Sequence, residues 1–206
     1  MESEKQTINI LLDQLTQSKA TALFLVTLSI SIIGRMFIAW FWIFEYLFYC
    51  SIYFLFFLIS IAFITAIHER EHITKLKELG YEAINFKVHR VGDVSFWFEN
   101  IDRMSADEAY QNATSPFLKP LSYGSEIISI LILIMINIDS PFPLSSLLLI
   151  FSLLAFIHLV GSFCVFFIIH SRKTSGFCVK LARTITSRGD IDEIVSWNKK
   201  TLYRVT

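Results

Sequence analysis

The chain has 206 residues, of which 54% are hydrophobic, and its 18 basic and 18 acidic side chains leave no net charge. This balance gives no support for nucleic-acid binding, which depends on a basic surface. The three cysteines form no Cys-x-x-Cys pair, so small apolar side chains are a better interpretation than a redox or metal role.

Four long apolar runs dominate the chain and indicate that much of it lies in a lipid bilayer. A helix needs about 20 apolar residues to cross a bilayer, and only helices or closed barrels satisfy their backbone hydrogen bonds in lipid. Because runs of this length without alternation are helical, the sequence predicts an all-α membrane protein with four transmembrane helices. The runs cover residues 20–44, 46–67, 121–138 and 140–169.

The stretches between these runs divide the chain into five parts. Helical apolar spacing before the first run predicts an amphipathic helix along the inner membrane surface. The first two runs have almost no linker, so we expect a tight turn near residues 38–44. The parts are an amphipathic helix at 1–19, a transmembrane hairpin at 20–67, a cytoplasmic helix and hairpin module at 68–120, a second transmembrane hairpin at 121–169, and a cytoplasmic tail at 170–206 that packs on the module.

The cytoplasmic module is expected to combine a helix with a small sheet. The second span continues with helical spacing over residues 68–79 and ends at Gly80, a natural C-cap. Apolar side chains then alternate on both sides of a turn at residues 90–93, which predicts a β-hairpin near residues 84–98. The module is therefore α+β.

Short elements are predicted at the ends of the module and in the tail. Ser105 and Glu108 match a capping box and open a short helix. Residues 177–188 are expected to extend the fourth span, and a further helix opens at Asp190. Residues 201–205 alternate and predict a third strand beside the hairpin.

The basic residues predict the orientation in the membrane, because Lys and Arg collect on the cytoplasmic side. The segments 1–19, 68–120 and 170–206 carry two, seven and eight of them, which leaves only Arg35 from the total of 18. We therefore expect a multi-pass protein of a bacterial inner membrane with both termini in the cytoplasm.

One motif has the pattern of a catalytic metal site. The stretch His-Glu-Arg-Glu-His fits H-E-x-x-H, with His68 and His72 as zinc ligands one helical turn apart and Glu69 as general base. A third ligand must come from another part of the chain. His170 and Glu126 are expected at the same depth in the membrane, so either can supply it.

The charges inside the motif favour a structural interpretation instead. The two central positions, which are usually uncharged in zinc peptidases, hold Arg70 and Glu71, and Lys75 and Lys77 follow. This composition is typical of a solvated helix that leaves the membrane. We therefore expect no metal, no cofactor and no catalytic residue, and a protein that is not an enzyme.

A few ionisable residues fall in or near the predicted spans. Arg35 is expected to pair with Glu45 or to extend toward the interface, and Glu126 to reach the inner interface. His158 is expected to stay neutral through a hydrogen bond to a serine. So little polarity argues against a transport path, although a homo-oligomer that forms a pore stays open as an alternative.

The chain also resembles a known class of membrane proteins. Residues 10–27 read ILLDQLTQSKATALFLVT, and residues 72–105 read HITKLKELGYEAINFKVHRVGDVSFWFENIDRMS. These stretches and the overall layout are similar to surface-exclusion proteins of conjugative plasmids, particularly the IncI-type group. The resemblance implies a non-enzymatic immunity role in the inner membrane, where the protein blocks redundant transfer by recognising a component of the donor's conjugation machinery.

Residues 81–120 of the module, together with the tail, are the expected contact surface for such a protein partner, because recognition residues tend to lie on segments held by a scaffold. Two other functions remain as alternatives: a membrane-disrupting effector of a bacterial defence system, and a zinc-dependent membrane peptidase that uses the H-E-x-x-H motif. The candidate partner-binding residues are Lys87, Arg90, Asp93 and Trp97.

Overall fold

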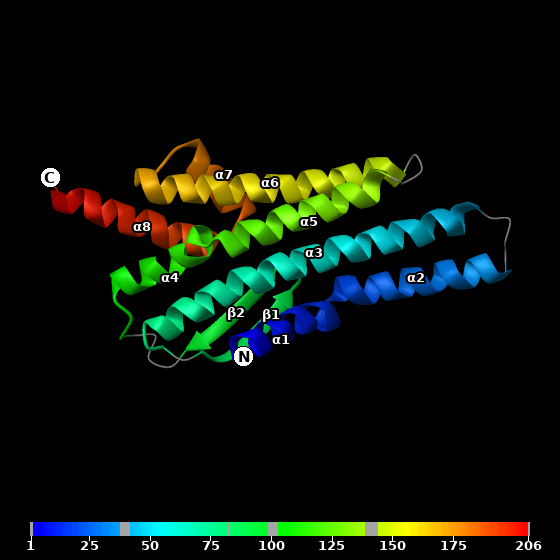
Figure 1. Ribbon diagram of the computed structural model, residues 1–206, viewed down its shortest axis with the longest axis horizontal. Coiled ribbons are helices and arrows are strands. Elements are labelled where there is room, and N and C mark those ends of the chain that lie inside the picture. The colour runs from blue at the N-terminus through cyan, green and yellow to red at the C-terminus, as the bar shows by residue number, and fades with distance from the viewer. Residues whose placement is uncertain (1, 38–41, 82, 99–102, 139–143, 206) are drawn as a thin grey trace.

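A computed structural model describes residues 2–37, 42–81, 83–98, 103–138 and 144–205. These residues form eight helices and one two-stranded sheet (Figure 1). The turn expected near 38–44 falls largely outside this part of the chain. The elements are α1 Glu2–Gln17, α2 Lys19–Phe37, α3 Trp42–Glu78, β1 Ala83–Arg90, β2 Asp93–Phe98, α4 Ala106–Leu118, α5 Pro120–Ile138, α6 Leu144–Ser171, α7 Phe177–Ile185 and α8 Arg188–Val205.

Three helical stretches are long and apolar enough to cross a membrane, and these are Ile43–Glu78, Ala106–Met135 and Ser152–Ser171. The pair Lys5–Gln17 and Lys19–Gly34 passes the same test together but is bent by 57°. The described chain therefore has three candidate spans, or four if the bent pair counts as one. This is compatible with a membrane protein of mainly helical structure, as expected.

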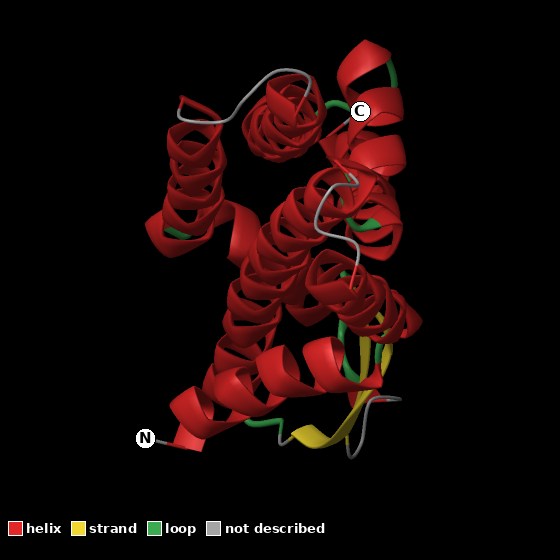
Figure 2. Cartoon of the chain, turned by 90° about the vertical axis from the view of Figure 1, so that its right-hand side faces the viewer, coloured by secondary structure: helices red, strands yellow, loops and turns green. Residues whose placement is uncertain are grey.

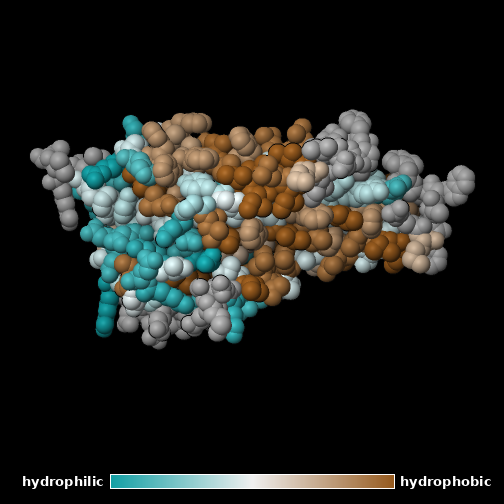
Figure 3. Space-filling model, in the orientation of Figure 1, coloured by the Kyte–Doolittle hydropathy of each residue, from teal (hydrophilic) through white to brown (hydrophobic). Residues whose placement is uncertain are grey.

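The long helices run side by side in the order α6, α5, α3 and α2 (Figure 1). Hydrophobic residues cover the middle of this bundle, and hydrophilic residues gather at the end formed by α1, the hairpin, α4 and α8 (Figure 3). Seen along the long axis, the hairpin lies at the periphery beside α1 (Figure 2). The polar elements thus form a cap at one end of an apolar bundle.

The predicted β-hairpin is confirmed. β1 pairs with β2 in antiparallel register, with Phe86 opposite Phe96 and Lys87 opposite Ser95. Gly92 in the turn has a φ of +82°, a conformation that favours glycine. Apolar side chains on one face of the sheet pack against α1 and α3 in a cluster that includes Ile10, Ala66, Ile73, Phe86, Val94 and Phe96.

The capping box is also confirmed. The Ser105 side chain accepts from the Glu108 backbone N–H, and the Glu108 carboxylate accepts from the Ser105 N–H at 2.8 Å. The helix that follows, α4, is longer than expected and continues to Leu118. A second apolar cluster joins α4 to α6, α7 and α8 through Ala113, Phe117, Val165, Ile168, Val179, Ala182, Ile191, Ile194 and Val195.

Two expectations for the tail are wrong. The fourth span does not continue beyond Ser171, because Arg172 and Gly176 have φ values of 51° and 112° and end the helical path before α7. Residues 201–205 form the end of α8 rather than a third strand. Extending an existing helix adds a hydrogen bond with each residue, whereas a third strand needs a free sheet edge nearby.

Candidate metal centre

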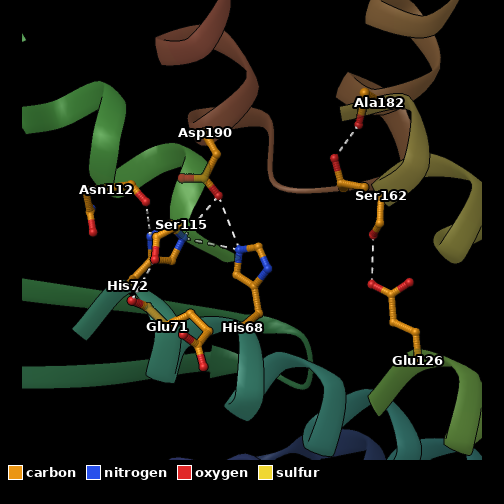
Figure 4. Close-up of polar contacts among 10 residues, drawn as sticks. His68, Glu71, His72, Asn112, Ser115, Glu126, Ser162, Ala182 and Asp190 are labelled. Carbon is orange, nitrogen blue, oxygen red and sulfur yellow. Dashed lines mark hydrogen bonds and ion pairs between the residues drawn. The ribbon is translucent and has the colours of Figure 1, made fainter. Parts of the chain in front are cut away.

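The two histidines of the motif lie one turn apart on the same face of α3, which turns toward α4 and α8 (Figure 4). The ring of Phe117 on α4 packs edge-on against His68, with ring centroids 5.1 Å apart. His72 and Glu71 are each only 7% exposed. The expectation of a solvated helix face was therefore wrong, because α4 and α8 cover this stretch of α3.

Asp190, in the first turn of α8, points at both histidines (Figure 4). Its Oδ2 lies 3.3 Å from Nε2 of His68 and 3.3 Å from Nε2 of His72. The two Nε2 atoms lie 3.2 Å from each other. Three atoms of the kind that bind metals, from two helices far apart in the sequence, thus form a nearly equilateral triangle.

Hydrogen bonding accounts for this triangle only if His72 carries two ring protons. Nδ1 of His72 lies 3.0 Å from the backbone carbonyl oxygen of Asn112, which only accepts, so this nitrogen carries a hydrogen. In the neutral ring, Nε2 of His72 then carries no hydrogen and can only accept. It faces the Asp190 carboxylate, which is also an acceptor. Two acceptors in contact need a cation between them: a second proton on His72 or a metal ion.

The dimensions of the triangle fit a zinc ion. With zinc–ligand bonds of about 2.0–2.1 Å, the edges of a coordination tetrahedron are about 3.3 Å long. The three measured edges are 3.2, 3.3 and 3.3 Å. The carbonyl of Asn112 supplies the outer contact that metal-bound histidines usually make through their other ring nitrogen. The donor set of two imidazoles and one carboxylate matches that of catalytic sites, which keep the fourth position open.

The charge state of Asp190 suits a ligand. Burial opposes its ionisation, but the positive charge of His72 and the hydrogen bonds from both histidines outweigh burial and hold the pKa of the Asp190 carboxyl well below its usual value. A carboxylate must be ionised to bind a metal ion. Asp190 is therefore ionised, as coordination requires, and a metal ion would take the place of the second proton on His72.

A cavity of about 780 Å³ opens beside the triangle. His68 and Glu69 line its polar end, together with Asp93 of the hairpin and Gly189 just before Asp190. Glu69 lies within electrostatic range of the three triangle residues. Toward the middle of the bundle the cavity walls are mostly apolar and come from α3, α5 and α6. The arrangement joins candidate ligands and a candidate base to a space that extends between the spans.

The two third ligands suggested by the sequence are not in the triangle. His170 is exposed at the end of α6, and its Nδ1 lies 2.9 Å from the carbonyl oxygen of Phe166 on the same helix. The side chain of Glu126 is directed at α6. It is 5% exposed, and its Oε1 accepts from the Ser162 hydroxyl at 2.7 Å.

The other polar residues singled out in the spans are separate from the triangle. His158 lies 3.4 Å from Glu126, so its observed partner is a carboxylate rather than the serine expected. Glu45 is exposed near the start of α3. The side chain of Arg35 lies outside the part that the structure describes.

The candidate partner-binding residues lie on the hairpin. Lys87 is exposed, and Trp97 is 51% exposed. Asp93 lines the cavity instead of facing away from the bundle. The side chain of Arg90 is not among those described.

Sequence reasoning missed Asp190 as a ligand. The sequence predicted Asp190 only as the start of a helix, and Asp190 does lie in the first turn of α8. It lies 122 residues from His68 and 118 from His72, so no local spacing links the three. The only signal was a carboxylate directly after a glycine in a segment expected to pack on the module.

No protein-family model, curated protein or solved structure matches the chain.

Proposed function

We propose that the protein is a zinc-dependent membrane peptidase whose site lies where the polar cap meets the apolar bundle. The observation that carries this proposal is the triangle of His68, His72 and Asp190, with edges of 3.2 to 3.3 Å. It adjoins a cavity that His68 and Glu69 line. Two histidines at this helical spacing with a glutamate after the first are the pattern of zinc peptidases, in which the glutamate is the general base.

Each residue has a distinct role in this proposal. His68, His72 and Asp190 hold the ion, and the Asn112 carbonyl keeps the hydrogen of His72 on Nδ1 so that Nε2 faces the ion. A bound zinc ion supplies Lewis acidity toward water and a substrate carbonyl. Glu69 takes a proton from the attacking water and returns it to the leaving amine. Burial beneath α4 and α8 keeps bulk water away from the ligands.

The location in the cell is part of the same proposal. We place the protein in a bacterial inner membrane with the polar cap in the cytoplasm, because nearly all Lys and Arg residues belong to that end. The site then acts on peptide segments at or just inside the cytoplasmic surface of the bilayer.

The test uses the full chain purified in detergent, with metal measured by mass spectrometry and hydrolysis followed on fluorescein-labelled casein. Wild-type protein is expected to carry stoichiometric zinc. His72→Ala and Asp190→Ala lose the metal and the activity, because each removes a ligand. Glu69→Gln keeps the metal and loses about 100-fold or more in rate, because only the base is removed.

His170→Ala is the matched control, since that histidine is exposed and bonded within its own helix. It is expected to retain both zinc and activity. Wild-type protein that binds no zinc after incubation with zinc chloride would overturn the proposal, and so would equal zinc content in Asp190→Ala.

The exclusion function and the membrane-disrupting function stay predictions of the sequence. One observation favours a protein contact: Trp97 is 51% exposed on the hairpin, where an aromatic side chain can anchor a partner. Such a contact is compatible with the proposed peptidase site, because the hairpin lines the cavity through Gly92, Asp93 and Val94 and not through Trp97.

A further inference from the structure

A second polar cluster lies in the apolar part of the bundle, between α5 and α6. Glu126 of α5 accepts from the Ser162 hydroxyl of α6 at 2.7 Å (Figure 4). Nδ1 of His158, one turn before Ser162, lies 3.4 Å from the same carboxylate oxygen. Ionisable residues are costly in this environment and mark a functional site by default.

Two atoms of this cluster lack hydrogen-bond partners among the described residues. They are the second carboxylate oxygen of Glu126, Oε2, and Nδ1 of His158, and both are buried. The contact between His158 and Glu126 is short enough for an ion pair but lacks the alignment of a hydrogen bond. Leaving such atoms unpaired away from water costs several kcal/mol. The cluster is therefore incomplete as it stands.

His158 lines the same cavity as His68 and Glu69. Ile61 and Ile64 of α3, together with Leu154 of α6, form part of the apolar wall of this space. Glu126 stands behind His158 and does not line the cavity itself. One cavity thus has His68 and Glu69 at its polar end and His158 among the spans.

We propose that His158, positioned by Glu126, binds the peptide backbone of a membrane-embedded substrate segment. This rests on the proposed peptidase function, because cleavage of such a segment requires it to unwind near the metal. An unwound stretch exposes backbone N–H and C=O groups that find no water in the bilayer. A histidine in the cavity wall supplies a partner for these groups while the scissile bond reaches Glu69.

The chemistry of the cavity favours a peptide over a lipid chain. An acyl chain has no polar atoms at the depth of the spans, so it offers no hydrogen bond to the part of the His158 ring that lines the cavity. A peptide carries a donor and an acceptor at every residue. His158 is therefore a binding residue, and Glu126, which acts through it, is a positioning residue.

The experiment places the full chain in nanodiscs with a fluorescent hydrophobic peptide long enough to span the bilayer. Binding is measured in the Glu69→Gln background, which separates binding from catalysis, and kcat and KM are measured in the active background. His158→Leu is expected to weaken peptide binding and raise KM about tenfold, the size of one lost hydrogen bond. Zinc content is expected to stay at the wild-type level, because His158 is not among the candidate ligands.

Glu126→Gln keeps an oxygen for Ser162 but removes the charge, so a smaller rise in KM with unchanged kcat is expected. His170→Leu, on the same helix but exposed, is the matched control and binds the peptide as the parent does. His158→Gln, which keeps a polar group, is expected to recover part of the binding and provides a folded variant if the leucine variant is unstable.

The outcomes separate the two proposals. Unchanged peptide binding in both His158 variants overturns the role of His158 even if casein is cleaved. Loss of peptide binding in a protein that cleaves nothing supports the binding site and rejects the peptidase function. His158-dependent binding of a lysophospholipid, without such binding of the peptide, overturns the assignment to a peptide backbone.

Discussion

At the scale of single residues, a missing side chain at Gly161 lets α6 approach the segment that leads to Asp190. A Cβ built there would lie 2.9 Å from Cγ2 of Thr186 and 3.1 Å from Cγ2 of Ile185. Ile185 ends α7 and Thr186 follows it, two residues before α8, which holds Asp190 in its first turn. The position of the third candidate ligand therefore depends on a close contact far from the histidines in sequence.

Gly161→Ala is predicted to push the segment at 185–186 away from α6. The expected result is a loss of about 1 kcal/mol or more in the free energy of unfolding, typical of overpacking, and weaker zinc binding. Denaturant titration and a zinc competition assay measure the two effects. Gly124→Ala is the control, because a Cβ there meets nothing within 4 Å. Equal behaviour of the two variants would contradict the role assigned to Gly161.

At the scale of elements, Gln14 joins α1 to both α3 and the hairpin. It is fully buried, its amide nitrogen donates to the Ala62 carbonyl at 3.2 Å, and its amide oxygen accepts from the Gly92 N–H at 2.9 Å. Because Gly92 and Val94 line the cavity, this side chain fixes the cavity wall that the hairpin forms. An N-terminal helix that looks like a surface element thus supports the candidate site.

Gln14→Leu is predicted to leave the Gly92 N–H without its partner. A buried donor without an acceptor costs about 1–3 kcal/mol, so the free energy of unfolding falls by that amount and proteolysis in the hairpin speeds up. Limited proteolysis in detergent, with sites mapped by mass spectrometry, measures the local effect. Gln17→Leu, at an exposed position of the same helix, is expected to change stability by less than about 0.5 kcal/mol. Equal protection of the hairpin in the two variants would argue against the link.

At the scale of the whole molecule, the polar cap is the end of the bundle that we propose faces the cytoplasm. α1, α4, α8 and the hairpin gather at this end (Figure 1). Reporter fusions at Lys119 and Thr206 are predicted to read cytoplasmic, and a fusion at Ser140 periplasmic, because Lys and Arg resist translocation. A periplasmic signal at Thr206 would reverse the orientation and move the candidate metal centre to the other side of the membrane.

Local patterns in the sequence were enough to predict several elements. Apolar runs indicated the long helices, alternation on both sides of residues 90–93 predicted the hairpin, and the spacing of Ser105 and Glu108 predicted the start of α4. Each of these depends on residues within a few positions of one another. Alternation at residues 201–205 predicted a strand, which is wrong, because α8 continues through this segment.

By itself, the sequence determined the apolar helices, the hairpin and the spacing that puts His68 and His72 on one face of α3. Only the tertiary structure decided that this face is buried and that Asp190 completes the triangle. The physical reason is that helical period and turn chemistry act over a few residues. The meeting of α3 with α8 instead depends on apolar packing among α4, α6, α7 and α8, which brings together atoms 118 or more residues apart.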